Sequence, residues 1–319
     1  MADKASRALV IYGDGLMPFL SRQHTNIHKL ASLGCCGFLA LRNAPLGENE
    51  DVKVARELAQ LLDVPCAYNT GEHDHTDASA IFQKSCMPMI SERFMGMKAA
   101  FCTDCSIAKS FGKDAGFTVT NVHELMEGNV TSGHLDQDKL DTPILASRLL
   151  KLLGLQYGDV VETNENDLVL VHVEASTESF AANELEFVNL LVGEIIEIAQ
   201  NAPKISSRLH LSLVLSYGSV PENESRSFLT LSPEKDDGNL SMLYPHQSYT
   251  MKEGKILNGI RHHHPMLIAQ WQEAVTRRDM AQVFEFEEFK KHGGNLAILA
   301  ERFIHEVAFK LWKAPKYGA

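Results

Sequence analysis

The chain has 319 residues, of which 45% are hydrophobic and 22% are charged, a composition typical of a globular protein with one large or two medium domains. Lysine and arginine together number 30 against 41 aspartates and glutamates, which gives a formal charge of -11 at pH 7. Because contacts with a phosphate backbone need a basic face, this balance argues against a nucleic-acid partner.

The first residues do not show the basic and apolar pattern of a secretory leader, and no apolar stretch is long enough to span a bilayer. We therefore expect a cytoplasmic protein without a membrane partner. In that compartment the six cysteines are expected to be free thiols rather than a disulfide framework.

Short apolar runs alternate along the chain with amphipathic stretches of helical period. This alternation predicts an α/β fold, with a mostly parallel sheet covered by helices on both faces. Residues 217–260 are predicted to be a long loop or hairpin region. The predicted strands are 8–12, 36–41, 98–103, 117–122, 167–173 and 209–216, and the predicted helices are 25–34, 105–116, 141–155, 183–200 and the tail from about 285 onward.

Polar residues stand where several of these strands end. Asp14 follows the first strand within Gly-Asp-Gly, His172 and Glu174 close a later one, and Tyr217 and Ser219 follow the strand at 209–216. In open sheets of this type ligands bind at the carboxyl ends of the strands, so this edge is the expected site. The simpler interpretation makes Asp14 a turn residue and His172 a buried histidine with satisfied hydrogen bonds.

Two parts of the chain resemble the archaeal-type, cofactor-independent phosphoglycerate mutases of the alkaline phosphatase superfamily. Residues 7–49 contain "RALVIYGDGL" and most of "HTNIHKLASLGCCGFLALRNAPLGENED", and residues 95–180 contain "MKAAFCTDCSIAKSFGKDAGFTVTNV" and "NENDLVLVHVEASTES". The resemblance implies an alkaline-phosphatase-like three-layer sandwich. It implies one domain over residues 1–319, in which residues 50–95 are a shortened remnant of the family's inserted substrate domain.

The family's chemistry uses a serine nucleophile bridged by two divalent metals, usually manganese, which lower the pKa of the serine and neutralise the phosphoryl oxygens. By the resemblance, Asp14 matches the first metal ligand. Glu48, or Asn49 if the turn is shifted by one residue, stands where the serine is expected, and neither has a hydroxyl group. A site that survived would hold manganese or another divalent metal through Asp14 and Glu48.

Most of the other matched positions have lost the residue types that the chemistry needs. Thr177 and Ala181 stand where the resemblance implies an aspartate and a histidine, and Glu178 is the carboxylate nearby. Where the family has Asp-His-Ser, this chain reads Tyr217, Gly218 and Ser219. No residue is therefore assigned a catalytic role. Asn49, His172, Thr177, Glu178, Tyr217 and Ser219 are the residues of a remnant site.

Two function hypotheses follow. The first is a phosphoglycerate-mutase-like protein without catalysis, which binds a phosphorylated small molecule or a protein partner. The alternative is a metal-dependent phosphoglycerate mutase or phosphatase, with a glycolytic type of substrate. Its site would be rebuilt from Asp14, Glu48, Glu178 and one histidine of 262–264.

Two further motifs have weaker interpretations. Cys102 and Cys105 have the spacing of a redox pair at the start of a helix, which would make the protein a thiol sensor. The segment "GEHDHTD" at 71–77 is interpreted as a solvated polar loop rather than a metal site, because zinc motifs need further ligands at defined spacing.

Overall fold

The computed structural model describes residues 6–43, 50–64, 88–127, 141–161, 165–175, 178–218, 239–293 and 297–315. A central sheet of eight strands runs through the molecule, and β11 is antiparallel to both its neighbours while the other pairs are parallel. In sheet order the strands are β12 (Ala297–Leu299), β2 (Cys35–Ala40), β11 (Met266–Trp271), β8 (Leu209–Leu215), β1 (Arg7–Asp14), β7 (Leu168–Glu174), β3 (Ala99–Cys102) and β4 (Thr118–Thr120).

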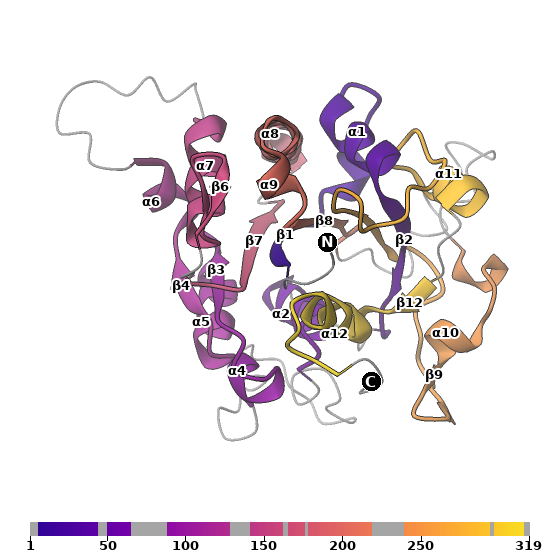
Figure 1. Ribbon diagram of the computed structural model, residues 1–319. Helices are drawn as coiled ribbons and strands as arrows, with labels where there is room; N and C mark the ends of the chain where they lie inside the picture. Colours follow the sequence, from indigo (N-terminus) through magenta and orange to yellow (C-terminus); the bar gives the residue numbers. More distant parts are fainter. Residues whose placement is uncertain are drawn as a thin grey trace.

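Helices cover both faces of the sheet, as the alternation predicts (Figure 1). One face carries α1 (Thr25–Leu33), α7 (Thr142–Leu152) and α8 (Glu178–Asn201). The other face carries α2 (Glu50–Leu61), α5 (Ser106–Asp114) and α12 (Ala300–Lys310). The central strands are buried on both faces, which explains why β1 is a continuous apolar run rather than an alternating one.

Shorter elements fill the connections. Two small hairpins pair β5 (Leu155–Gln156) with β6 (Asp159–Val160) and β9 (Met251–Lys252) with β10 (Lys255–Ile256). The short helical turns are η1 (Met17–Phe19), α4 (Ile90–Arg93), α6 (Val122–Glu127), α9 (Pro203–Ser206), η6 (Leu240–Met242), α10 (Gln247–Thr250), α11 (Phe286–Glu288) and η7 (Phe289–Gly293).

The prediction of one continuous helix at the C-terminal end was wrong. Residues 297–299 form β12, which pairs with β2, and α12 begins only at Ala300. Ala297 and Leu299 are buried on the sheet. So short an apolar run fits both the period of a strand and that of a helix. Strand β11 was not predicted either.

Helix α2 was not expected within residues 50–95. It packs against α5 and α12 and contributes Val52, Leu58 and Leu61 to the core on that face. Residues 65–87, which include the segment at 71–77, lie outside the described residues. The single domain with a shortened insertion therefore stays a prediction. Within the described ranges, no helix combines the length and apolarity that crossing a membrane requires.

Candidate functional site

Three parallel strands bring their carboxyl ends to one edge of the sheet. Register pairs Asp14 at the end of β1 with Glu174 at the end of β7, and Ser216 follows directly on β8. Along β1, Tyr12 belongs to the core on the α2 face, and Asp14, two residues on, shares that face. Asp14 is only 4% exposed, so the expected site residue is buried rather than open to solvent.

The Ser216 hydroxyl is the centre of this edge. It donates to Asp14 Oδ1 at 2.8 Å and accepts from the backbone N–H groups of Gly15 at 3.0 Å and Gly218 at 3.2 Å. A serine hydroxyl has one donor and two acceptor positions, and the Tyr12 hydroxyl lies a further 3.5 Å from the same oxygen. The hydroxyl therefore ties the turn after β1 to the turn after β8 and occupies one of the two Asp14 oxygens.

The two turns also touch through their glycines. Gly15 and Gly218 have φ values of +70° and +66°, in the left-handed region, and a Cβ atom built on Gly218 would lie 3.0 Å from Gly15 Cα. Backbone therefore packs on backbone at the place where the resemblance implies metal ligands.

This packing predicts that Gly218→Ala lowers the free energy of unfolding by about 2 kcal/mol, because alanine adds left-handed strain and a backbone clash. Gly158→Ala is the matched control: Gly158 has φ +76°, but a Cβ atom added there would have no neighbouring atom within 4 Å, and the substitution should cost about 1 kcal/mol. Urea denaturation of both variants measures the difference. Equal losses in the two variants would show that the close approach of the turns is unimportant.

The second oxygen of Asp14 faces a histidine. Asp14 Oδ2 and His172 Nε2 lie 3.8 Å apart, too far for a hydrogen bond, and neither atom has a hydrogen-bond partner among the described residues. The other ring nitrogen, His172 Nδ1, lies 3.0 Å from Thr103 Oγ1, and the ring stacks on Tyr12. His172 is thus buried as the simpler interpretation expected, but only one of its two nitrogens is satisfied.

A carboxylate from α2 completes the buried cluster. Glu57 accepts from the Tyr12 hydroxyl at 3.4 Å and from Arg261 Nη1 at 3.0 Å, and Arg261 Nη2 donates to the His264 carbonyl. Burial raises the pKa of Glu57 to about 7; Arg261 opposes the rise and Asp14 adds to it. Burial, Asp14 and Glu57 also raise the pKa of the Tyr12 phenol.

The histidine run at 262–264 reaches the same edge through one member. The His264 ring packs on Tyr217, and burial, with Arg261 and His263 nearby, lowers the pKa of His264 to about 4. His264 is therefore neutral at pH 7. His262 and His263 are exposed.

Several predicted site residues cannot be placed at this edge. Glu48, Asn49, Thr177 and Ser219 lie outside the described residues, and Glu178 begins α8 without a described side chain. Within the part of the chain that is described, no group of three His, Cys, Asp or Glu side chains is arranged to hold a metal ion. The residues described at this edge therefore do not assemble a dimetal centre. The Asp14 and Glu48 metal pair stays a prediction.

The two cysteines of the CTDC motif face different cores. Cys102 belongs to the core beside α7 and α8, whereas Cys105 packs against the core beside α2 and α5. Burial raises the pKa of Cys102 to about 12 and that of Cys105 to about 11, so neither thiol ionises readily. This arrangement does not favour the thiol-sensor hypothesis.

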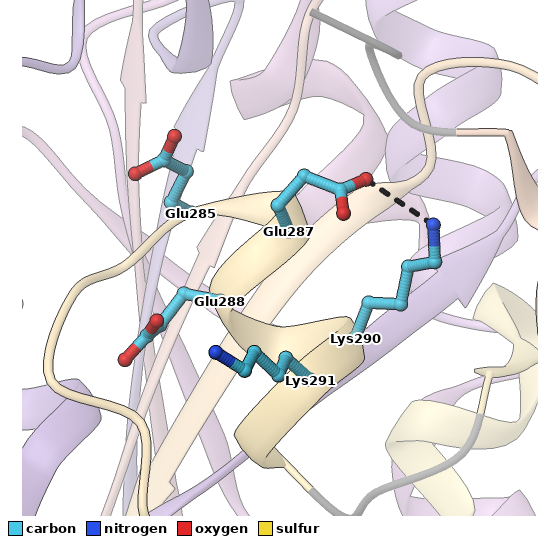
Figure 2. A pocket seen from close by; sticks show the side chains of 5 residues that line it. All are labelled: Glu285, Glu287, Glu288, Lys290 and Lys291. Atoms are coloured by element: carbon cyan, nitrogen blue, oxygen red, sulfur yellow. Dashed lines mark hydrogen bonds and ion pairs between the residues drawn. The ribbon is translucent and has the colours of Figure 1, made fainter.

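Away from this edge, a shallow hollow of about 510 Å³ lies over α11 and η7 (Figure 2). Its three glutamates already have partners within the protein: the Arg22 guanidinium, the Lys290 ammonium and the backbone N–H of Gln282. Because each of these carboxylates already has a partner within the chain, we assign the hollow no function. It is lined by Glu285, Glu287, Glu288, Lys290 and Lys291.

Comparison with known proteins gives structural similarities only. No family model matches the chain, and no curated protein sequence matches it. The structure of PH0037 from Pyrococcus horikoshii matches with a TM-score of 0.55 and 14% identity, over 99% of each chain. The lipoteichoic acid synthase LtaP from Listeria monocytogenes matches with a TM-score of 0.54 and 10% identity, over 99% of this chain and 74% of the synthase. The chain has an alkaline-phosphatase-like fold.

A third similarity is to a cofactor-independent phosphoglycerate mutase from Thermoplasma acidophilum, with a TM-score of 0.44 and 11% identity over 96% of this chain and 99% of the mutase. At these identities the similarities concern the fold alone. The alkaline-phosphatase-like fold confirms the predicted fold class and places Asp14, His172 and Tyr217 at the expected edge. Glu57, Arg261 and Ser216 were missed, and no motif in the sequence marks them.

Proposed function

We propose that this chain is a phosphoglycerate-mutase-like protein that does not catalyse phosphoryl transfer and that acts by binding a phosphorylated metabolite or a protein partner. The observation that carries the proposal is the bonding of the Ser216 hydroxyl. It donates to Asp14 Oδ1 at 2.8 Å and accepts from the backbone N–H groups of Gly15 and Gly218. The Ser216 bond engages Oδ1 only and leaves Oδ2 for a metal, but within the described residues no group of three His, Cys, Asp or Glu side chains is arranged to hold one.

The surrounding positions support the same conclusion. Phosphoryl transfer of the mutase type needs a nucleophile and several oxygen or nitrogen ligands around two metals. Ala181, where the resemblance implies a histidine, is fully buried in the core, and Gly218 packs against Gly15. Ala181 and Gly218 therefore contribute to the packing of the fold and offer no ligand atom from a side chain.

One observation favours the alternative, a metal-dependent mutase or phosphatase with a rebuilt site. Asp14 Oδ2 and His172 Nε2 are buried and lack hydrogen-bond partners among the described residues, and buried polar atoms in this state are uncommon. A rebuilt site would also need Glu48. The alternative is therefore tested directly by substitution at Asp14 and Glu48.

The deciding experiment is the conversion of 3-phosphoglycerate to 2-phosphoglycerate, followed by phosphorus NMR with and without manganese. We expect no more turnover from the protein than from the Asp14→Ala, Glu48→Ala double variant. Circular dichroism must show that the double variant is folded, and Asp159→Ala, which changes an exposed carboxylate, is the control. Turnover that the double variant loses and Asp159→Ala keeps would overturn the proposal.

The same sample separates the two binding modes. If 3-phosphoglycerate binds the folded chain without turnover, excess ligand should raise the Tm by mass action. A rise in Tm would support the metabolite, and an unchanged Tm would leave the protein partner as the binding function.

A further inference from the structure

The sequence contains a single Asn-Gly pair, Asn258–Gly259, shortly after the β9–β10 hairpin. Asparagine is a thermally labile residue. Its side chain reacts most easily before glycine, which has no Cβ atom to shield its backbone nitrogen. Asn258 is exposed, and Figure 1 shows β9 of this hairpin at the periphery of the molecule. The pair therefore lies where water reaches it.

The two groups that would react are not engaged in the fold. Among the described residues, neither the Asn258 side-chain amide nor the Gly259 N–H has a hydrogen-bond partner. Gly259 has φ +77°, and a Cβ atom built on it would meet no atom within 4 Å. A ring can therefore close between the Asn258 side chain and the Gly259 nitrogen without breaking a described hydrogen bond or displacing a neighbour.

Other positions show how the fold restrains this chemistry. Asp14–Gly15 could close the same ring with loss of water, but Asp14 is 4% exposed and the Gly15 N–H donates to Ser216 Oγ at 3.0 Å. The side-chain oxygen of Asn239 accepts from the backbone N–H of Ser241 at 3.0 Å, and a leucine follows Asn239. Asn258 has neither kind of restraint.

We propose that Asn258 is a site of spontaneous covalent modification, at which the side-chain amide closes onto the backbone nitrogen of Gly259 and water then opens the ring to isoaspartate. In the first step the Gly259 nitrogen bonds to Asn258 Cγ and gives up its proton. The bond from Cγ to the amide nitrogen breaks, and that nitrogen leaves as ammonia. In the second step water adds to one of the two ring carbonyls and the bond from that carbonyl to the Gly259 nitrogen breaks, which yields isoaspartate or aspartate without oxidation or reduction.

The isoaspartate product would alter the segment that positions Arg261. The Gly259 carbonyl accepts from the Asn43 N–H at 2.6 Å, the Arg261 N–H donates to the Leu41 carbonyl at 2.8 Å, and the Arg261 side chain reaches Glu57 at 3.0 Å. Isoaspartate carries the backbone through the side-chain carbons, so the backbone becomes one atom longer immediately before this segment. The modification is therefore expected to loosen both backbone bonds and the contact between Arg261 and Glu57.

The site is tested by incubating the folded chain at mildly alkaline pH. Isoaspartyl groups are then labelled with a carboxyl methyltransferase and assigned to residues by peptide mass spectrometry. We expect the label at position 258, with release of ammonia and one added negative charge. Asn258→Gln should abolish this label, because glutamine would have to close a larger ring.

Gly259→Ala tests the role of the glycine. Its methyl group shields the backbone nitrogen and should slow labelling at position 258 by an order of magnitude. Gly254→Ala is the matched control, because Gly254 has φ +76° and equally open surroundings but follows a glutamate in the β9–β10 turn. This control adds the same left-handed strain and should leave the labelling rate unchanged.

The effect on the fold is measured on the modified chain itself, which anion exchange separates by its added charge. Freshly purified Asn258→Asp is the matched control, since it has the same charge on an ordinary backbone. We expect the isoaspartate form to have a Tm about 2 °C lower than Asn258→Asp.

Three results would overturn the proposal. The first is the absence of isoaspartate at position 258 after incubation, and the second is a labelling rate that Gly259→Ala leaves unchanged. The third is an equal Tm for the isoaspartate form and Asn258→Asp, which would show that the segment holding Arg261 does not depend on the backbone before it.

Discussion

Replacing Ser216 with alanine is expected to lower the free energy of unfolding by about 3 kcal/mol, although it removes only one oxygen atom. The loss leaves Asp14 Oδ1 and the N–H groups of Gly15 and Gly218 without the partner that all three share. Leaving a buried polar group unsatisfied costs about 1 to 3 kcal/mol, and more for a charged group. Urea denaturation at pH 7 measures the change.

Ser206→Ala provides the control for removing a buried serine hydroxyl. Ser206 is 5% exposed, and its Oγ donates to a single carbonyl, that of Pro203. We expect a loss of about 1 kcal/mol or less. A double-mutant cycle between Ser216→Ala and Asp14→Ala should show strong coupling, since each substitution removes the same bond. Additive effects would mean that Ser216 does not hold Asp14.

The sequence was sufficient to predict which edge of the sheet carries the polar residues, but not which of them bond to one another there. Asp14, His172 and Tyr217 could be placed there because each stands at or directly after the end of an apolar run, and parallel strands end at one edge. Ser216 belongs to the last of these runs and has no distinguishing motif. Its bond to Asp14 joins positions 202 residues apart, and no local pattern predicts such a contact.

The same limit applies to the charged pair behind the edge. Glu57 lies on a helix within residues 50–95, which were predicted to be the remnant of an inserted domain. Arg261 directly precedes the histidines at 262–264, and the sequence interpretation considered only those histidines. Their contact spans 204 residues and depends on how α2 crosses the sheet. The error at β12 is different in kind, because an apolar run of three residues is too short to show whether its hydrophobic period is that of a strand or of a helix.

The pH dependence of stability provides a direct test of the Glu57 environment. Burial raises the pKa of this carboxyl from its ordinary value of 4.5 to about 7, so the folded chain holds the proton more tightly than the unfolded chain. The contribution of Glu57 to stability is therefore largest below pH 4.5. It falls as the pH rises towards 7 and is constant above that, with a total loss of about 3 kcal/mol.

Glu57→Gln isolates this contribution, because glutamine keeps the shape of the protonated side chain and does not titrate. Urea denaturation of the intact chain and the variant is compared from pH 4.5 to 8, and other groups, including His264, cancel in the difference. The variant should gain about 3 kcal/mol relative to the intact chain across this range. Arg261 has no charged partner at position 57 in the variant at any pH, and in the intact chain it gains one only as Glu57 ionises near pH 7, an attraction that the pKa of about 7 already includes. Parallel curves would mean that Glu57 is ionised in the fold at ordinary pH, and that Arg261 outweighs both burial and Asp14.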